Sequence, residues 1–240
     1  MVSLLGIRVD DVTFAETLAR METFIARGTP HQICTVNPEF IMHAQRDAEF
    51  RDVLTRSALN VPDGGFLLRA ARRKGQPLRE RVTGIDTLQY FAELAARKGY
   101  RLFLLGAADG VAERAAHVLC TRHPALNIVG TYAGSPAADA APAIIARVRA
   151  AQPHALFVAY GAPQQDLWIA RYAAELQVPV MMGIGGAFDF IAGSVPRAPH
   201  WMQRLELEWL YRLVRQPRRW RRQLAIWQFA WLTLLSRVLT

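Results

Sequence analysis

Residues 101–131 read RLFLLGAADGVAERAAHVLCTRHPALNIVGT, and this stretch decides the fold. The apolar run Arg101 to Leu105 predicts a buried strand, and Gly106 to Gly110 predicts the turn that follows it. Val111 to Thr121 has helical spacing, and Asn127 to Thr131 predicts the next strand. A strand, a helix and a second strand in this order predict a parallel crossover unit.

The same alternation continues on both sides of this unit. Further strands are expected at residues 3–9, 31–36, 59–62, 155–160 and 178–184. Further helices are expected at residues 13–26, 39–56 (in one or two pieces), 86–98, 138–150 and 164–176. This pattern predicts an α/β fold: a Rossmann-like, mainly parallel sheet with helices on both faces. We expect this core to span residues 1–196 and a helical, membrane-binding appendage to span residues 197–240.

Composition is that of a globular protein in a reducing compartment. Apolar residues make up 52% of the chain, which is enough for a buried core. Cys34 and Cys120 lie in apolar segments and are expected to be small buried side chains, not a disulfide. The first residues, MVSLLGIRVDDVTF, lack the features of a signal peptide, so we expect a cytoplasmic protein. The six histidines are scattered, and the sequence offers no recognisable metal site.

Positive charge is concentrated at the end of the chain. The formal net charge is +9, and residues 197–240 contribute +7 of it through nine arginines and two glutamates. A basic tail of this kind suits nucleic acid, an anionic membrane or the phosphate groups of a substrate.

The appendage combines these arginines with apolar residues. Residues 201–215 predict an amphipathic helix, which Pro217 ends, and residues 218–222 read RRWRR. Residues 223–240 are almost wholly apolar but shorter than the roughly 20 residues that a membrane span needs. An interfacial helix on an anionic membrane fits better. The alternatives are packing on the protein's own core or on a second copy. Nucleic acid is disfavoured, because the arginines adjoin a lipid-like run.

Polar and glycine-rich turns follow most of the expected strands, where ligands of open α/β sheets bind. Asp63 lies on one of them, Pro62-Asp63-Gly64-Gly65. A carboxylate at this place could be a general base or only the N-cap of the next helix. The turns lack G-x-G-x-x-G and P-loop patterns, which disfavours a dinucleotide-dependent oxidoreductase.

Several motifs become specific when they are taken together. In chain order they are Thr35-Val36-Asn37-Pro38-Glu39, Pro62-Asp63-Gly64, Arg81-Val82-Thr83-Gly84, Leu105-Gly106, Gly161-Ala162-Pro163-Gln164-Gln165-Asp166, Gly183-Ile184-Gly185-Gly186-Ala187-Phe188-Asp189 and Glu208-Trp209-Leu210-Tyr211-Arg212. In this order, and with an arginine-rich tail, the chain resembles the WecG/TagA/CpsF family of bacterial glycosyltransferases over essentially its whole length.

The resemblance implies an inverting, metal-independent transfer from a UDP-sugar to a polyprenyl-diphosphate-linked saccharide, without a cofactor, at the inner face of the cytoplasmic membrane. It implies that Asp63 is the base and that four further residues line the pocket: Thr35, Asn37, Arg81 and Gln165. It also implies that arginines of the appendage stabilise the diphosphate: Arg212, Arg219 and Arg222. Gln164-Gln165-Asp166 stands where many members have Lys-Gln-Glu, so Gln164 is given no role.

Elementary chemistry agrees with these implications. A single displacement needs one base for the acceptor hydroxyl and positive charge for the departing diphosphate. Arginine suits the second task, because it is always charged and can bind phosphate with two hydrogen bonds. A non-catalytic nucleotide-sugar-binding or membrane-docking protein of the same fold is the alternative. The choice among N-acetylmannosamine, its uronic acid and glucose stays open, as does the oligomeric state.

Overall fold

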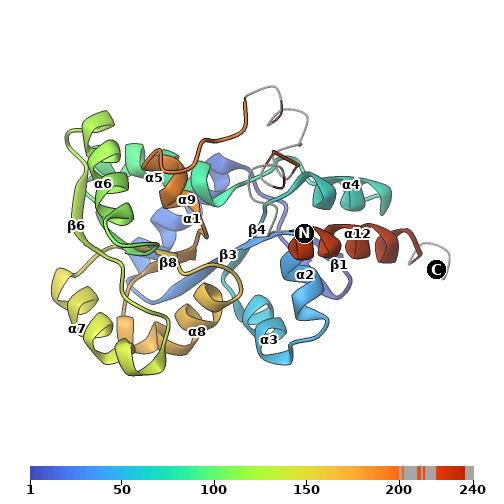
Figure 1. Ribbon diagram of the computed structural model, residues 1–240, viewed down its shortest axis with the longest axis horizontal. Helices are drawn as coiled ribbons and strands as arrows, with labels where there is room; N and C mark the ends of the chain where they lie inside the picture. Colours follow the sequence, from blue (N-terminus) through green and yellow to red (C-terminus); the bar gives the residue numbers. More distant parts are fainter. Residues whose placement is uncertain (200–201, 203–209, 212, 214–219, 236–240) are drawn as a thin grey trace.

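The computed structural model describes residues 1–199, 202, 210, 211, 213 and 220–235, with the backbone alone for 220–223 and 235. Figure 1 shows one central sheet with helices above and below it, and a helical extension, α12, beside α2 and α4. This architecture confirms the predicted α/β class.

The central sheet has six strands, and every neighbouring pair is parallel. The strands are β3 (His31–Val36), β4 (Leu59–Pro62), β5 (Arg101–Gly106), β6 (Asn127–Tyr132), β7 (Ala155–Ala159) and β8 (Val180–Gly183). Their order across the sheet is β4-β3-β8-β7-β5-β6. Strands from the first and the second half of the chain thus meet where β3 pairs with β8. Open parallel sheets usually bind ligands at such a point, beyond the carboxyl ends of the strands.

The helices of the core are α1 (Phe14–Arg27), α2 (Pro38–Ala44), α3 (Ala48–Arg56), α4 (Gly65–Arg73), α5 (Gly84–Lys98), α6 (Val111–Arg122), α7 (Ala141–Ala151), α8 (Gln164–Leu176) and α9 (Ala187–Ile191). A 3-10 turn, Ala138–Ala140, precedes α7. The segment expected to be helical at residues 39–56 is two helices, because Asp47 caps a new one. Helices α1, α5, α6 and α9 cover one face, and α3, α7 and α8 lie on the other (Figure 1).

The side chains of β5 point alternately to the two faces of the sheet and contact the helices on both. Leu102 and Leu104 are buried in the cluster under α5 and α6, whereas Phe103 and Leu105 are buried in the cluster under α7 and α8. Successive side chains of a strand point to opposite faces, so a strand buried on both sides is apolar throughout. This is why the run at residues 101–105 identified the fold.

The single strand expected at residues 3–9 is wrong. The structure has a hairpin there, β1 (Val2–Leu4) paired antiparallel with β2 (Ile7–Val9), outside the main sheet. Leu5 and Gly6 form the turn with φ of 48° and 80°. Positive φ at two successive positions is typical of tight hairpin turns, and glycine adopts it without strain.

The appendage contributes α12 (Trp220–Leu235), which lies against α2 and α4 (Figure 1). Phe229 of this helix is 1% exposed and belongs to the cluster that the hairpin forms with α2, α3 and α4. Arg46, in the turn after α2, donates a hydrogen bond to Gln228, with Nη2 to Oε1 at 3.1 Å. One face of α12 therefore packs on the core, as one of the expected alternatives states. The helix expected at residues 201–215 lies mostly outside the described residues.

Candidate active site

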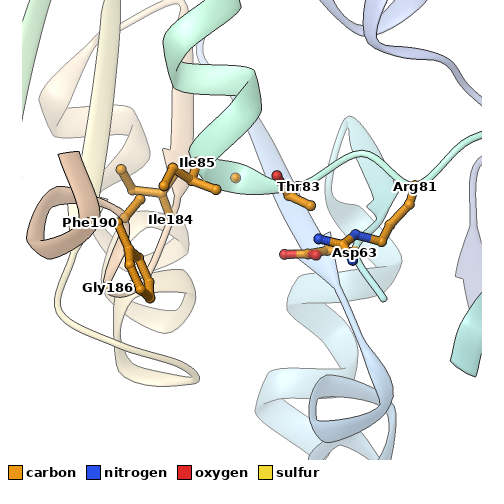
Figure 2. A pocket seen from close by; sticks show the side chains of 9 residues that line it. Asp63, Arg81, Thr83, Ile85, Ile184, Gly186 and Phe190 are labelled. Atoms are coloured by element: carbon orange, nitrogen blue, oxygen red, sulfur yellow. The ribbon is translucent and has the colours of Figure 1, made fainter. Parts of the chain in front are cut away.

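A pocket opens beyond the ends of β4 and β8 and beside the first turn of α5. Figure 2 shows polar groups from the turn after β4 and from the segment before α5 on one side of it, and apolar groups near β8 on the other. Its lining residues are Asp63, Arg81, Thr83, Gly84, Ile85, Ile184, Gly186, Ala187 and Phe190.

Asp63 enters this pocket from the turn after β4. Its backbone N–H donates to the Val36 carbonyl at 2.7 Å, which continues the pairing of β4 with β3 for one more residue. Helix α4 begins at Gly65, and its N-cap is Gly64, which makes no side-chain capping bond. Asp63 is therefore not the N-cap residue of α4 but lies one position before it. Gly64 has a φ of 149°, a conformation that glycine tolerates, and this turn leaves the Asp63 carboxylate among the pocket residues.

Arg81 lies in the same pocket on the segment that leads into α5. The Val82 N–H donates to the Pro62 carbonyl at 2.8 Å, so this segment runs beside the end of β4. Figure 2 shows the Arg81 side chain extending toward Asp63. A carboxylate and a guanidinium at one strand end provide a proton acceptor and a binding group for an anion.

Residue Thr83, at the start of α5, fixes the rim of the pocket. Its hydroxyl accepts from the Asp86 N–H at 3.2 Å and donates to Asp86 Oδ2 at 2.6 Å. Arg197 binds the same carboxylate with two hydrogen bonds of 2.6 and 2.8 Å. Burial opposes the charge on Asp86, but Arg197 and Thr83 outweigh it and lower the pKa of this carboxyl. The chain that leads to the appendage is thus bound at the rim of the pocket.

Sequence reasoning named neither Asp86 nor Arg197. The spacing Thr83-x-x-Asp86 before an apolar run indicates an N-cap with an acid in the first turn, and it was the available signal. Arg197 had no such signal, because it pairs with a residue 111 positions away.

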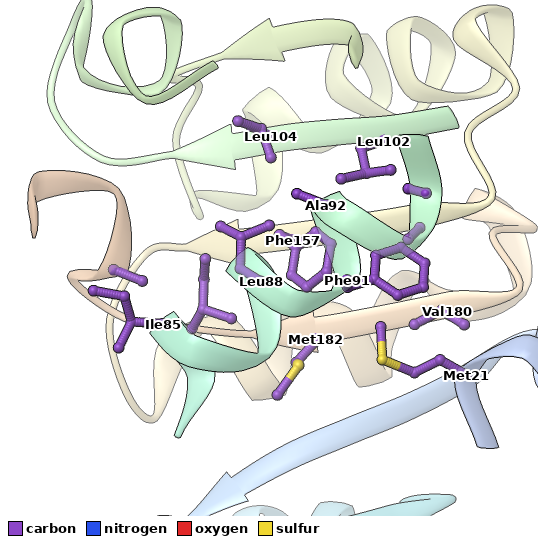
Figure 3. Packing of buried hydrophobic residues seen from close by; sticks show 14 of the residues in the cluster. Met21, Ile85, Leu88, Phe91, Ala92, Leu102, Leu104, Phe157, Val180 and Met182 are labelled. Carbon is purple, nitrogen blue, oxygen red and sulfur yellow. The ribbon is translucent and has the colours of Figure 1, made fainter. Parts of the chain in front are cut away.

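The body of α5 holds this rim in place through the core. Figure 3 shows Leu88, Phe91 and Ala92 packed over the sheet, against Leu102 and Phe157. All five side chains are fully buried. Close packing of this kind leaves little freedom to the first turn of the helix, and a site on a rigid element keeps its geometry.

Thr35 and Asn37 lie at the end of β3 and directly after it, and they are not among the described lining residues of this pocket. The Thr35 hydroxyl is buried and donates to the Gly183 carbonyl at 3.2 Å, which links β3 to β8. Asn37 caps α2, accepting from the Phe40 N–H at 3.0 Å. A side-chain atom at Gly64 would lie 3.4 Å from Pro38 and 3.9 Å from Asn37, so this cap supports the turn beside Asp63.

Gln165 is buried at the start of α8 and joins two loops. Its Oε1 accepts from the N–H of Gly161 at 3.2 Å and of Gly185 at 2.9 Å. These glycines follow β7 and β8, respectively. Gln165 thereby shapes the loop that forms the apolar wall of the pocket.

Three predicted site residues lie on the appendage. Arg212 and Arg219 lie outside the described residues, and of Arg222 the structure describes only the backbone, on α12. Among the described residues, no three His, Cys, Asp or Glu side chains are placed so that they could share a metal ion.

Comparison with known proteins agrees with this geometry. Residues 2–240 match the model of the family described as Glycosyl transferase WecG/TagA/CpsF family. The chain is 36% identical, over 85% of its length and 78% of the relative's, to the N-acetylglucosaminyldiphosphoundecaprenol N-acetyl-beta-D-mannosaminyltransferase of Bacillus subtilis (strain 168). It is 30% identical to the enzyme of the same name from Staphylococcus aureus (strain NCTC 8325 / PS 47), over 88% of this chain and 83% of the relative. The chain therefore belongs to the WecG/TagA/CpsF family and is a glycosyltransferase.

Proposed function

We propose that this protein transfers a sugar from a UDP-sugar to a polyprenyl-diphosphate-linked saccharide in the synthesis of a bacterial cell-surface polysaccharide. Asp63 in the pocket after β4 is the observation that carries the proposal, because its carboxylate lies beside an arginine among the residues that line the pocket. The names of both relatives describe transfer to an N-acetylglucosaminyl diphosphoundecaprenol, which favours an acceptor of that class here.

Asp63 acts as the general base of a single displacement. Its carboxylate takes the proton of the acceptor hydroxyl, the oxygen forms a bond to the anomeric carbon, and the bond from that carbon to the UDP oxygen breaks. One displacement inverts the anomeric centre, so an α-linked donor gives a β-linked product. The relatives' names specify a β-mannosaminyl product, which is consistent with this course.

Arginines stabilise the negative charge that develops on the departing UDP, and no metal is required. Arg81 supplies this charge inside the described pocket. We assign the same task to Arg212, Arg219 and Arg222 of the appendage, on the family resemblance. A guanidinium binds a phosphate through two parallel hydrogen bonds and keeps its charge at every working pH.

The exposed face of α12 attaches the protein to an anionic membrane, as a peripheral protein on the inner face of the cytoplasmic membrane. Leu224, Trp227, Trp231 and Leu234 follow one another at intervals of three or four residues, and each is about half or more exposed. No helix in the described part of the chain is both long and apolar enough to cross a membrane. Tryptophan prefers the boundary between headgroups and acyl chains, so this face suits an interfacial position.

The donor is best identified by assay of the purified protein with a panel of UDP-sugars. UDP-N-acetylmannosamine is the first candidate, by similarity to the relatives; the uronic acid derivative and UDP-glucose are the others. The acceptor is a short-chain polyprenyl diphosphate carrying N-acetylglucosamine, and the readout is the mass of the lipid product. We expect one added N-acetylhexosamine. UDP binding without any added sugar, in the whole panel, would instead support a non-catalytic nucleotide-sugar-binding protein.

A further inference from the structure

Helix α4, which begins two residues after Asp63, has a strongly cationic outer face. Its inner face is buried through Leu67, Ala70 and Ala71, at the spacing of an amphipathic helix. Residues 197–240 hold most of the net charge of the chain, yet residues 65–79 contain five positive side chains and no acidic one. Four of the five are exposed on α4 or directly after it: Arg69, Arg72, Arg73 and Lys74. A concentration of like charge on one face is expected to meet an anionic partner.

Arg72 and Arg73 carry the charge of this face that the core does not neutralise. The fifth cation, Arg79, is bound by two carboxylates, those of Asp11 at 2.9 Å and Glu16 at 2.6 Å. In contrast, Arg72 and Arg73 form no ion pair with any residue that the structure describes. Neighbouring like charges on a helix repel each other, so an anion bound from outside would stabilise this face.

The outer face of α4 adjoins the exposed face of α12. Figure 1 shows the two helices side by side at the same end of the molecule, and they contact each other. Their inner faces share one apolar cluster, which contains Leu67 of α4 and Phe229 of α12. The described side chains of α12, at residues 224–234, include no charged group. Among the described residues, α4 therefore supplies the positive charge beside the exposed Trp227 and Trp231.

An anionic membrane is the partner that fits both faces. Arginines near such a surface attract its headgroups, and tryptophans prefer the boundary between headgroups and acyl chains. A nucleic acid would bind the arginines of α4 but would leave the exposed apolar side chains of α12 in water. An apolar protein surface would cover α12 but would take the charges of α4 out of water without pairing them.

We infer that α4 is a second membrane-binding element, in which Arg72 and Arg73 bind anionic lipid headgroups while α12 enters the interface, and that this contact turns the pocket toward the membrane. Helix α4 begins at Gly65, directly after the turn that carries Asp63, and its nine residues span roughly 14 Å. The pocket thus lies one short helix away from the headgroups, the level at which the diphosphate of a lipid-linked acceptor lies. The orienting half of this inference rests on the proposed sugar transfer, and the headgroup binding does not.

Sedimentation of the full chain with phosphatidylglycerol vesicles tests the headgroup binding. We expect Arg72→Gln/Arg73→Gln to bind roughly 25-fold more weakly than the unaltered protein, because each arginine near an anionic surface contributes about fivefold in affinity. The matched control is Arg20→Gln/Arg149→Gln, which removes the same charge from exposed positions on α1 and α7, helices that pack on other clusters of the core. The control should bind within about twofold of the unaltered protein, because its charges lie more than a Debye length from the membrane. Unchanged binding by the α4 variant, or equal weakening in both variants, would overturn the inference.

Lipid composition and a nucleic-acid competitor identify the anion. The difference between the α4 variant and the unaltered protein should vanish on phosphatidylcholine vesicles, which carry no net charge, and should decrease as salt is added to phosphatidylglycerol vesicles. A difference that persists on phosphatidylcholine would contradict binding of anionic headgroups. A DNA duplex that displaces the unaltered protein from phosphatidylglycerol vesicles, and that binds the α4 variant less well, would assign α4 to nucleic acid instead.

Transfer to two forms of the acceptor tests the orienting half. The rate is measured with the lipid-linked acceptor in phosphatidylglycerol vesicles and with a short-chain soluble acceptor, and the ratio of the two rates is compared between proteins. We expect this ratio to fall in Arg72→Gln/Arg73→Gln about as much as vesicle binding does, and to stay constant in the control. An equal ratio in both variants would contradict the orienting role. Absence of transfer by every protein, with vesicle binding that still depends on Arg72 and Arg73, would refute the proposed function and leave the headgroup binding supported.

Discussion

The pocket after β4 and the outer face of α12 are built in opposite ways. In the pocket, polar groups such as Asp63 and Arg81 stand at the edge of a fully buried core, and α5 buries its apolar face completely. On α12, Phe229 is buried while Trp227 and Trp231 are 59% and 64% exposed. Apolar side chains exposed in one patch are expected to meet an apolar partner. The first region thus suits the polar sugar and phosphates of the proposed lipid-linked acceptor, and the second suits the proposed contact with a membrane.

Replacement of the proposed base, Asp63, should have the largest effect, and it should lower kcat without involving α12. Asp63→Asn keeps the shape of the side chain but cannot accept the proton, so we expect kcat to fall by roughly 10²–10⁴-fold. The fall should be the same for a short soluble acceptor and for an acceptor in vesicles, because the chemistry is the same in both. Asp139→Asn is the matched control, and the thermal unfolding temperature of both variants should stay close to that of the unaltered protein. An unchanged kcat in Asp63→Asn would show that Asp63 is not the general base.

Removal of the buried anchor of α12 should act on stability. Phe229→Ala takes a fully buried ring out of the cluster beneath α2 and α4, and such truncations cost about 3–5 kcal/mol. Denaturant unfolding measures this loss. Trp231→Ala is the control on the same helix, and it should change the free energy of unfolding by less than about 0.5 kcal/mol because its side chain is exposed. Equal losses in the two variants would mean that α12 has no distinct outer face.

Removal of the exposed tryptophans should act on membrane attachment alone. We expect the double variant Trp227→Ala/Trp231→Ala to bind phosphatidylglycerol vesicles roughly tenfold more weakly, because it loses aromatic area at the interface. Its kcat on a soluble short-chain acceptor should be unchanged. Vesicle sedimentation measures the first quantity. Unaltered vesicle binding by the double variant would assign membrane attachment to another surface.

Breaking the ion pair at the rim should have the smallest effect. Arg197→Gln removes two hydrogen bonds to a half-buried Asp86, and we expect a loss of about 1–2 kcal/mol in the free energy of unfolding at pH 7. The pKa of Asp86 is lowered in the folded state, so the contribution is present above its ordinary pKa and is lost as pH falls through the lowered value. The difference in the free energy of unfolding between Arg197→Gln and the unaltered protein should therefore become smaller at acidic pH. A difference that is equally large at pH 2.5 and pH 7 would show that Arg197 acts by packing.

The sequence predicted the sheet well, because strands buried on both faces are continuous apolar runs that need no partner to be recognised. The family resemblance placed Asp63 and Arg81 in one pocket, and both are among the residues that line the pocket after β4. The hairpin at residues 2–9 was missed, because its two-residue turn at Leu5 and Gly6 interrupts an apolar run without a polar residue.

The burial of Gln165 and Asp166 could not be predicted from the sequence, for a different reason. Polar residues at the start of a helix are usually exposed, and only the packing of α8 against Gly183 encloses these two. The apolar segment at the end of the chain left two alternatives open, because its large apolar residues occupy both faces of α12. The structure shows which face the core covers: the one that carries Phe229.

The affinity of Asp63→Asn for UDP, measured by calorimetry, tests most directly that Asp63 acts on the acceptor proton and not on donor binding. A base contributes to the transition state, so its loss lowers the rate without weakening the ground-state complex. The account predicts that Asp63→Asn binds UDP as tightly as the unaltered protein or more tightly, because a negative charge near the diphosphate has been removed. A UDP affinity that falls in proportion to the loss of rate would contradict it.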